Sequence, residues 1–123
     1  MSTYDDQNVF AKLLRGEIPN KTVLETEHAL AFEDIAPQAP LHVVVIPKGA
    51  YTTFDDFAAR ATAEEIADFM QSVGRVAREA GVAASDGYRV LSNAGAHAEQ
   101  EVPHFHMHVV GGRPLGRILA PSA

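Results

Sequence analysis

Cysteine is absent from this sequence, and basic side chains are scarce. The absence of cysteine excludes disulfides, zinc sites with thiolate ligands and cysteine nucleophiles. Lys and Arg together number 10 against 16 Asp and Glu, which gives a formal net charge of −6. A net anion is poorly suited to coating nucleic acid or an anionic membrane by charge alone, so we expect neither as a partner.

Long apolar runs and targeting signals are lacking as well. No apolar segment approaches the length that crosses a bilayer. The first residues, Met1 to Asp6, are polar and acidic, unlike the start of a secretory signal. We therefore expect a soluble, cytoplasmic protein. Its 123 residues, 46% hydrophobic and 21% charged, suit a single compact domain with its own core.

The spacing of apolar residues predicts two helices and five strands. A short helix is expected over Val9–Leu14, and Gly16 and Pro19 end it. A long helix is expected over Thr62–Ala80, where a capping box begins it and Gly81 ends it. Strands are expected at Thr22–Glu25, Leu30–Phe32, Leu41–Ile46, Tyr88–Leu91 and Pro103–Val110. This pattern is typical of an α+β domain with a mainly antiparallel sheet.

Three of the six histidines fall within five residues and alternate with apolar side chains: His104, His106 and His108. Because side chains alternate along a strand, the three imidazoles are expected on one face, with Phe105, Met107 and Val109 on the core face. Two alternative interpretations of the three histidines are an exposed polar strand face and a metal site. We favour phosphoryl or nucleotidyl transfer, because a neutral imidazole is a good nucleophile at cellular pH.

The segment His104–Val110 resembles the H-φ-H-φ-H-φ-φ signature of the histidine triad (HIT) superfamily. The likeness extends from about residue 8 to about residue 114. It includes Val9–Pro19, Phe32–Pro40, His42, Ile46–Lys48, Gly87–Arg89, Asn93 and Gly111–Arg113. These motifs resemble the Hint branch, the nucleoside phosphoramidases. The resemblance implies one HIT-like domain over residues 1–123, with a C-terminal tail at 115–123, and a homodimer.

The resemblance also implies a reaction, cleavage of the P–N bond of purine nucleoside 5′-monophosphoramidates. His106 would attack the α-phosphorus and form a nucleotidyl-histidine that water then hydrolyses. His108 would contact the phosphate and help to protonate the leaving nitrogen. His104 would hold the nucleophile through its backbone carbonyl, and His42 would orient the nucleophilic imidazole. The substrate would carry an AMP or GMP moiety, and neither a metal nor a cofactor is required.

Residues for the nucleotide follow from the same resemblance. Asn93 would donate to a phosphate oxygen, and backbone N–H groups of Gln100, Glu101 and Val102 would complete the phosphate cradle. Asp34 would bind the ribose hydroxyls. The alternative for Asn93 is a turn residue, and the alternative for Asp34 is an exposed loop carboxylate. The base pocket would be walled by Phe10, Leu13, Phe32, Ile35 and Val44, for which core packing is an equal alternative.

Some positions depart from the family pattern. Glu101 stands where many members carry a small hydroxyl residue, so we expect its carboxylate to turn outward or to meet a cationic leaving group. His97 is expected at the surface, or against the substrate if the loop closes. Two other activities stay open: hydrolysis or nucleotidyl transfer on dinucleoside polyphosphates, and a nucleotide-binding regulatory module with incidental activity. A zinc protein that uses the histidine cluster is a further alternative.

Overall fold

Five antiparallel strands form one sheet in the order β1-β2-β3-β5-β4. The computed structural model describes residues 4–119. The strands are β1 (Thr22–Glu25), β2 (Ala29–Glu33), β3 (Leu41–Pro47), β4 (Tyr88–Leu91) and β5 (Met107–Gly111). The helices are α1 (Val9–Leu14), α2 (Phe54–Arg60) and α3 (Ala63–Glu79), with short 3-10 turns η1 (Val82–Ala84) and η2 (Ala96–Ala98). The predicted α+β class with an antiparallel sheet is confirmed.

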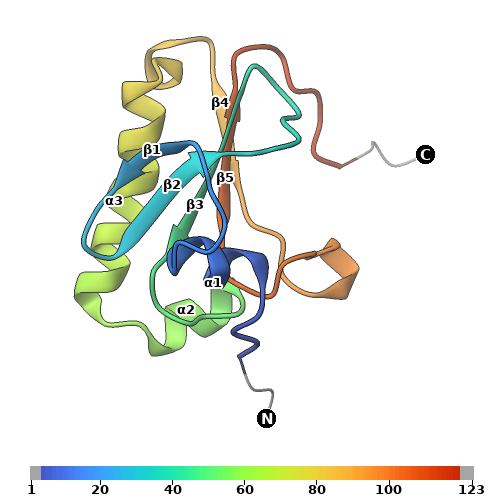
Figure 1. Ribbon diagram of the computed structural model, residues 1–123. Coiled ribbons are helices and arrows are strands. Elements are labelled where there is room, and N and C mark those ends of the chain that lie inside the picture. The colour runs from blue at the N-terminus through green and yellow to red at the C-terminus, as the bar shows by residue number, and fades with distance from the viewer. Residues whose placement is uncertain (1–3, 120–123) are drawn as a thin grey trace.

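The long helix α3 covers one face of the sheet, and α1 lies over the opposite face (Figure 1). Thr62 and Glu65 form the predicted capping box at the start of α3, and Gly81 follows its end with a left-handed φ of 83°. Both ends therefore lie where the sequence predicts them. The apolar stripe of α3 packs with Val43, Val45 and Val109 of the sheet, and each fully buried side chain contributes roughly 1.5–3 kcal/mol.

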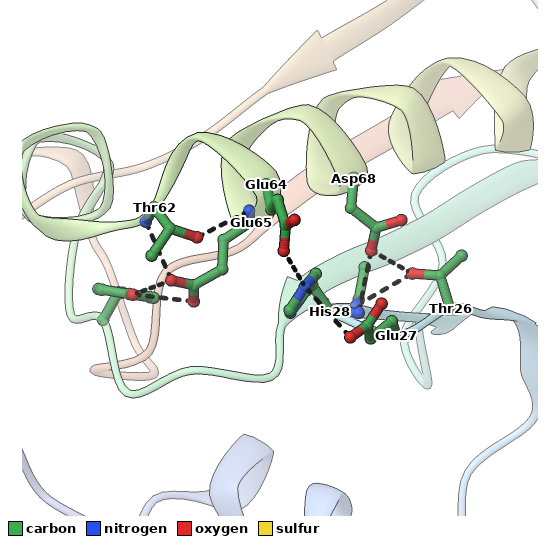
Figure 2. A network of polar contacts seen from close by, with 9 residues as sticks. Thr26, Glu27, His28, Thr62, Glu64, Glu65 and Asp68 are labelled. Atoms are coloured by element: carbon green, nitrogen blue, oxygen red, sulfur yellow. Dashed lines mark hydrogen bonds and ion pairs between the residues drawn. The ribbon is translucent and has the colours of Figure 1, made fainter.

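A polar network fastens the β1–β2 turn to the first half of α3 (Figure 2). One carboxylate oxygen of Asp68 accepts from the Thr26 hydroxyl at 2.6 Å and from the His28 backbone N–H at 3.0 Å. The His28 ring lies 3.8 Å from a Glu27 oxygen and 4.0 Å from a Glu64 oxygen. His28 thus belongs to the packing of α3 and lies outside the histidine cluster.

The opposite face carries a second apolar cluster: Leu13, Leu30, Phe32, Val44 and Ile46, with Phe10, Leu14 and Ile18 against it. Val44 pairs with His108 in the β3–β5 ladder. Because paired residues in antiparallel strands project from the same face, the His108 imidazole points to the side of the sheet that α1 covers. The pairing register therefore places the histidines beside this second cluster.

The last strand is shorter than predicted. It begins at Met107 rather than Pro103, and His104 lies in a bend before it. The reason is that the backbone here bonds outside the ladder: the His104 N–H donates to the Val102 carbonyl at 2.8 Å, and the Phe105 N–H donates to the Tyr51 carbonyl at 2.7 Å. The alternation of side chains nevertheless continues through the bend.

Helix α2 was not among the predicted elements. It is one short helix of seven residues, capped by the Thr53 side chain, which accepts from the Asp56 N–H.

No helix within residues 4–119 is long and apolar enough to cross a membrane. The predicted C-terminal tail, 115–123, is described only as far as residue 119, and the first three residues also lie outside the described range.

Candidate active site

Four of the six histidines gather where β3 meets β5. His104 comes from the bend, His106 from the irregular residues just before β5, His108 from β5 and His42 from β3. His104 is fully buried, and His42 and His106 are nearly so. On the other side of the strand, Phe105 stacks on Phe57 with ring centroids 4.9 Å apart. The predicted division into a histidine face and a core face is therefore present at these positions.

The His106 ring is held with one nitrogen free. Its Nδ1 lies 2.7 Å from the backbone carbonyl oxygen of His104. A carbonyl oxygen only accepts, so Nδ1–H is the donor and the lone pair of the neutral ring is on Nε2. The Phe10 ring packs edge-on against the imidazole, with centroids 5.0 Å apart. This geometry presents Nε2 as a nucleophile with a fixed direction.

A chain of hydrogen bonds fixes the protons of His42 and His108. The Gln38 backbone N–H donates to Nδ1 of His42 at 3.0 Å, so the proton of neutral His42 is on Nε2. That Nε2 lies 2.8 Å from Nδ1 of His108 and 3.4 Å from a carboxylate oxygen of Asp34. Nδ1 of His108 is therefore an acceptor, and Nε2 of His108 carries a hydrogen that it can donate.

Burial favours the neutral form of the three triad imidazoles, His104, His106 and His108. It lowers the pKa of His104 to about 4, and the carbonyl of Pro47 offsets only part of this effect. Burial likewise lowers the pKa of His108 to about 4, and the proximity of the His106 and His42 rings adds to this effect. The pKa of His106 is also lowered by burial, against the opposing effects of the His104 carbonyl and the Asp34 carboxylate. A neutral His106 keeps the lone pair that a nucleophile requires, and a neutral His108 has a defined tautomer.

Asp34, His42 and His108 are close enough to be examined as a metal site, since their ligand atoms lie within 4.8 Å of one another. The chemistry of the donor set argues against such a site. A metal at Nε2 of His42 needs the lone pair there, which would place the proton on Nδ1, opposite the Gln38 N–H. The residues present fit a proton relay better than a metal, and we route no step through an ion.

Two residues that the sequence analysis did not assign to the site form hydrogen bonds with backbone carbonyls at the site. The Ser92 hydroxyl donates to the backbone carbonyl of His106 at 2.7 Å. The Arg113 guanidinium donates to the Gln38 carbonyl at 2.6 Å and so holds the residue whose backbone N–H bonds His42. Both bonds end on backbone atoms, which leave no signal in the sequence pattern.

The loop before the triad is organised by Gln100. Its side-chain oxygen accepts from the Gly95 N–H at 2.9 Å, and its amide nitrogen donates to the carbonyls of Thr52 and Val102 at 2.8 and 3.0 Å. The Gln100 backbone N–H donates to the Gly95 carbonyl at 3.1 Å. This N–H is therefore engaged and is not available for the predicted phosphate cradle, a correction that leaves the N–H groups of Glu101 and Val102. The Glu101 side chain is exposed.

The predicted nucleotide residues differ in their burial. Leu13, Phe32 and Val44 are buried in the second apolar cluster, so their core packing is evident. Ile35 is 98% exposed and has no part in the core. Asn93 is half-buried just beyond the end of β4. Asp34 is half-buried, and one of its oxygens accepts from the Ala36 N–H at 2.8 Å.

Comparison with known proteins shows the family of this chain. The family model described as HIT domain matches residues 15–115. The chain belongs to the HIT family. It is 66% identical over 117 residues to an uncharacterized 13.2 kDa HIT-like protein of Azospirillum brasilense, with 95% of each chain covered. It is 39% identical over 115 residues to the purine nucleoside phosphoramidase of Escherichia coli, with 94% of this chain and 95% of the relative covered.

Solved structures of HIT proteins share the fold. A HIT family hydrolase from Clostridium thermocellum superimposes with a TM-score of 0.84 at 34% identity, over 94% of this chain and 99% of that chain. Family membership therefore rests on sequence and on structure together, over nearly the whole length of the HIT protein described here.

Proposed function

We propose that this HIT protein hydrolyses the P–N bond of purine nucleoside 5′-monophosphoramidates. The observation that carries the proposal is the His106 imidazole, whose Nδ1–H is bound by the His104 carbonyl at 2.7 Å while Nε2 is free. The lowered pKa of His106 supports it, because burial keeps this ring in its nucleophilic form. The similarity to a protein named purine nucleoside phosphoramidase supports the proposed substrate class.

The first step forms one bond and breaks one. Nε2 of His106 attacks the α-phosphorus, and the bond from phosphorus to the leaving nitrogen breaks. The leaving nitrogen takes the proton of His108 Nε2–H while a proton from solvent replaces it on the ring, so that the amine departs neutral and His108 stays neutral. The His106 ring becomes cationic as its lone pair bonds phosphorus, and the His104 carbonyl stabilises the charge at Nδ1–H.

The second step regenerates the ring. Water attacks phosphorus, the bond from phosphorus to Nε2 of His106 breaks, and the proton of the water is released to solvent, which balances the proton taken up in the first step. The products are the nucleoside monophosphate and the free enzyme. Asn93 and the N–H groups of Glu101 and Val102 are the proposed donors to the phosphate oxygens, Asp34 the acceptor for the ribose hydroxyls, and Ile35 and Phe10 the contacts to the base.

The decisive experiment traps the covalent intermediate. Enzyme mixed with an adenosine 5′-phosphoramidate is quenched in alkali, where phosphohistidine survives, and digested for mass spectrometry. We expect an adenylyl group on His106, no adduct in His106→Asn, and an unchanged adduct in His28→Asn, a histidine outside the cluster. Turnover with the adduct on another residue, or full turnover in His106→Asn, would falsify the proposal.

The leaving group separates this proposal from the alternatives. An amine leaves poorly unless it is protonated, whereas a phosphate leaves as an anion. The N–H that His108 presents therefore favours a phosphoramidate over a dinucleoside polyphosphate, and rates measured side by side with both substrates test this choice. Cellular effects that survive His106→Asn would instead indicate a regulatory binding module.

A homodimer joined through β4 is part of the proposal. β4 is an edge strand, and its Tyr88 and Val90 side chains are 44% and 37% exposed. An exposed apolar edge strand favours pairing with another chain. A second copy of this chain offers an identical strand, which a two-fold axis would place antiparallel to the first.

A further inference from the structure

The N-terminal segment reaches the histidine cluster through Tyr4, a residue 100 positions away in the sequence from its partner. The Tyr4 hydroxyl is hydrogen-bonded to Nδ1 of His104. The two rings meet edge-on, with centroids 5.6 Å apart and an interplanar angle of 71°. Tyr4 is therefore in contact with the residue whose carbonyl holds the nucleophile.

The direction of this hydrogen bond follows from the other contacts of His104. Nε2 of His104 lies 2.8 Å from the Pro47 carbonyl oxygen, which only accepts. The proton of the neutral ring is therefore on Nε2, and Nδ1 accepts the Tyr4 O–H. Burial raises the pKa of Tyr4, so the hydroxyl keeps its proton at physiological pH.

Asn8 fixes the Tyr4 hydroxyl from the other side. The Asn8 amide nitrogen donates to the Tyr4 oxygen at 2.9 Å. The amide oxygen of the same residue accepts from the Ala11 N–H at 2.9 Å and caps α1. Asn8 is buried, and both ends of its side chain are engaged. The start of α1, Tyr4 and His104 thus form one connected network with a single pattern of donors and acceptors.

We propose that Tyr4 is a positioning residue, which orients the His104 imidazole and thereby aims the His104 carbonyl at Nδ1 of His106. His104 lies in a bend, where no ladder hydrogen bond fixes its backbone. The Phe105 N–H, in the same peptide as the His104 carbonyl, donates to Tyr51, and the two ring hydrogen bonds, to Tyr4 and Pro47, hold the side chain. Together these bonds set where the carbonyl points. The kinetic consequence rests on the proposed phosphoramidase reaction, whereas the hydrogen-bond network itself is testable without any substrate.

Removing the hydroxyl leaves a buried acceptor unpaired. In Tyr4→Phe, Nδ1 of His104 loses its donor inside a site that excludes water, a situation that costs free energy. The ring escapes this cost by rotating or by exchanging its tautomer, and either change breaks the bond to Pro47. The carbonyl of His104 then loses its alignment with His106, so the rate of P–N cleavage falls while nucleotide binding persists.

The kinetic test compares Tyr4→Phe with Tyr51→Phe. Tyr51 is a matched control because its hydroxyl is also bonded, to Glu65 at 2.8 Å, but on the α3 side of the sheet. We expect kcat of Tyr4→Phe to fall about tenfold, the effect of losing one well-formed hydrogen bond, with KM changed less than about twofold. Tyr51→Phe should leave both constants unchanged.

The second readout is the state of the ring nitrogens in the free, full-length protein. Two-bond ¹H–¹⁵N correlation spectra report which nitrogen of each histidine is protonated and hydrogen-bonded. In Tyr4→Phe we expect the Nδ1 signal of His104 to move toward that of an unbonded nitrogen and the His106 signals to move with it. Neither set should move in Tyr51→Phe.

The two readouts separate the possible failures. Shifted His104 and His106 signals in a protein without phosphoramidase activity would refute the proposed function and support the positioning role. A shifted His104 signal with unchanged His106 signals and unchanged kcat would overturn the positioning role. If Tyr4→Phe does not fold, Asn8→Asp gives the same test, because its carboxylate keeps the α1 cap but draws the Tyr4 proton away from His104.

Discussion

Nε2 of His42 is 2.8 Å from Nδ1 of His108 and 3.4 Å from a carboxylate oxygen of Asp34. The Nε2–H of His42 therefore faces two acceptors, Nδ1 of His108 and the Asp34 carboxylate. Because it donates to Nδ1 of His108, the hydrogen of His108 is on Nε2, the nitrogen turned away from β3. His42 thus acts through His108 and never needs to touch the substrate. This relationship ties proton donation at the leaving group to a residue on the neighbouring strand.

Replacing His42 should slow the reaction most for substrates with basic leaving groups. In His42→Leu, Nδ1 of His108 loses its donor, so the His108 hydrogen is no longer directed to Nε2. General acid catalysis contributes ~10²–10⁴-fold, and we expect kcat with an alkylamine leaving group to fall by about 10²-fold. A nitrophenolate leaving group, which needs no proton, should lose far less.

His42→Gln is the matched variant, because a glutamine amide retains an N–H donor. Its loss should lie between those of wild type and His42→Leu. Equal losses for both leaving groups would show that His42 contributes to folding of the site rather than to proton donation. Rates are measured with nucleotide kept constant and only the leaving group changed.

The pH dependence of the reaction should reflect the lowered pKa of His106. Burial lowers this pKa from its usual 6.5, and protonation removes the lone pair that attacks phosphorus. As pH falls, kcat/KM is therefore expected to stay level through about pH 6.5 and to decline only below it. A decline centred at or above pH 6.5 would contradict a buried, neutral nucleophile.

Stability should depend on pH through His104. Its folded pKa of about 4 lies below the usual 6.5, so between these values the unfolded chain binds more protons. The stabilisation from keeping this ring neutral is fully present above about pH 6.5 and is lost as pH falls toward about 4. Urea unfolding at several pH values should show a steeper acid loss for wild type than for His104→Gln, which cannot titrate.

The elements that could be predicted depend on residues close together in the sequence. The capping box Thr62–Glu65 and the stop at Gly81 belong to single turns, and both are confirmed. The bend at His104 was missed because its cause is a bond to Tyr51, half the chain away. Helix α2 was missed because its seven residues give too little periodicity.

The histidines of the candidate site could be predicted because their alternation in the sequence is a distinctive pattern. The alternation from His104 to His108 places its residues correctly, and His42 joins them through the strand register. Ser92 and Arg113 bond backbone carbonyls, which any suitable donor could reach, so no residue pattern singles them out. Tyr4 depends on a tertiary contact across 100 positions, which local pattern cannot encode.

Ile35 and Val44 should respond to substitution in opposite ways. Ile35 is 98% exposed, so Ile35→Ser should leave the free energy of unfolding within about 0.5 kcal/mol of wild type. If Ile35 contacts the base, KM should rise by about three- to tenfold. Val44 is 2% exposed, and Val44→Ala should cost roughly 1.5–3 kcal/mol of stability. An unchanged KM in Ile35→Ser would remove this residue from the base pocket.

The two edge strands provide a controlled test of the homodimer. Val90 on β4 is 37% exposed and Val23 on β1 is 43% exposed, so lysine at either position removes an exposed apolar side chain without opening the core. β1 is interrupted by an irregular register between Thr22 and Leu24, which disfavours pairing along that edge. Light scattering coupled to size exclusion should therefore give the mass of two chains for wild type and Val23→Lys, but of one chain for Val90→Lys. A monomeric wild type would refute the homodimer. A Val90→Lys variant that remains dimeric would place the dimer contact elsewhere.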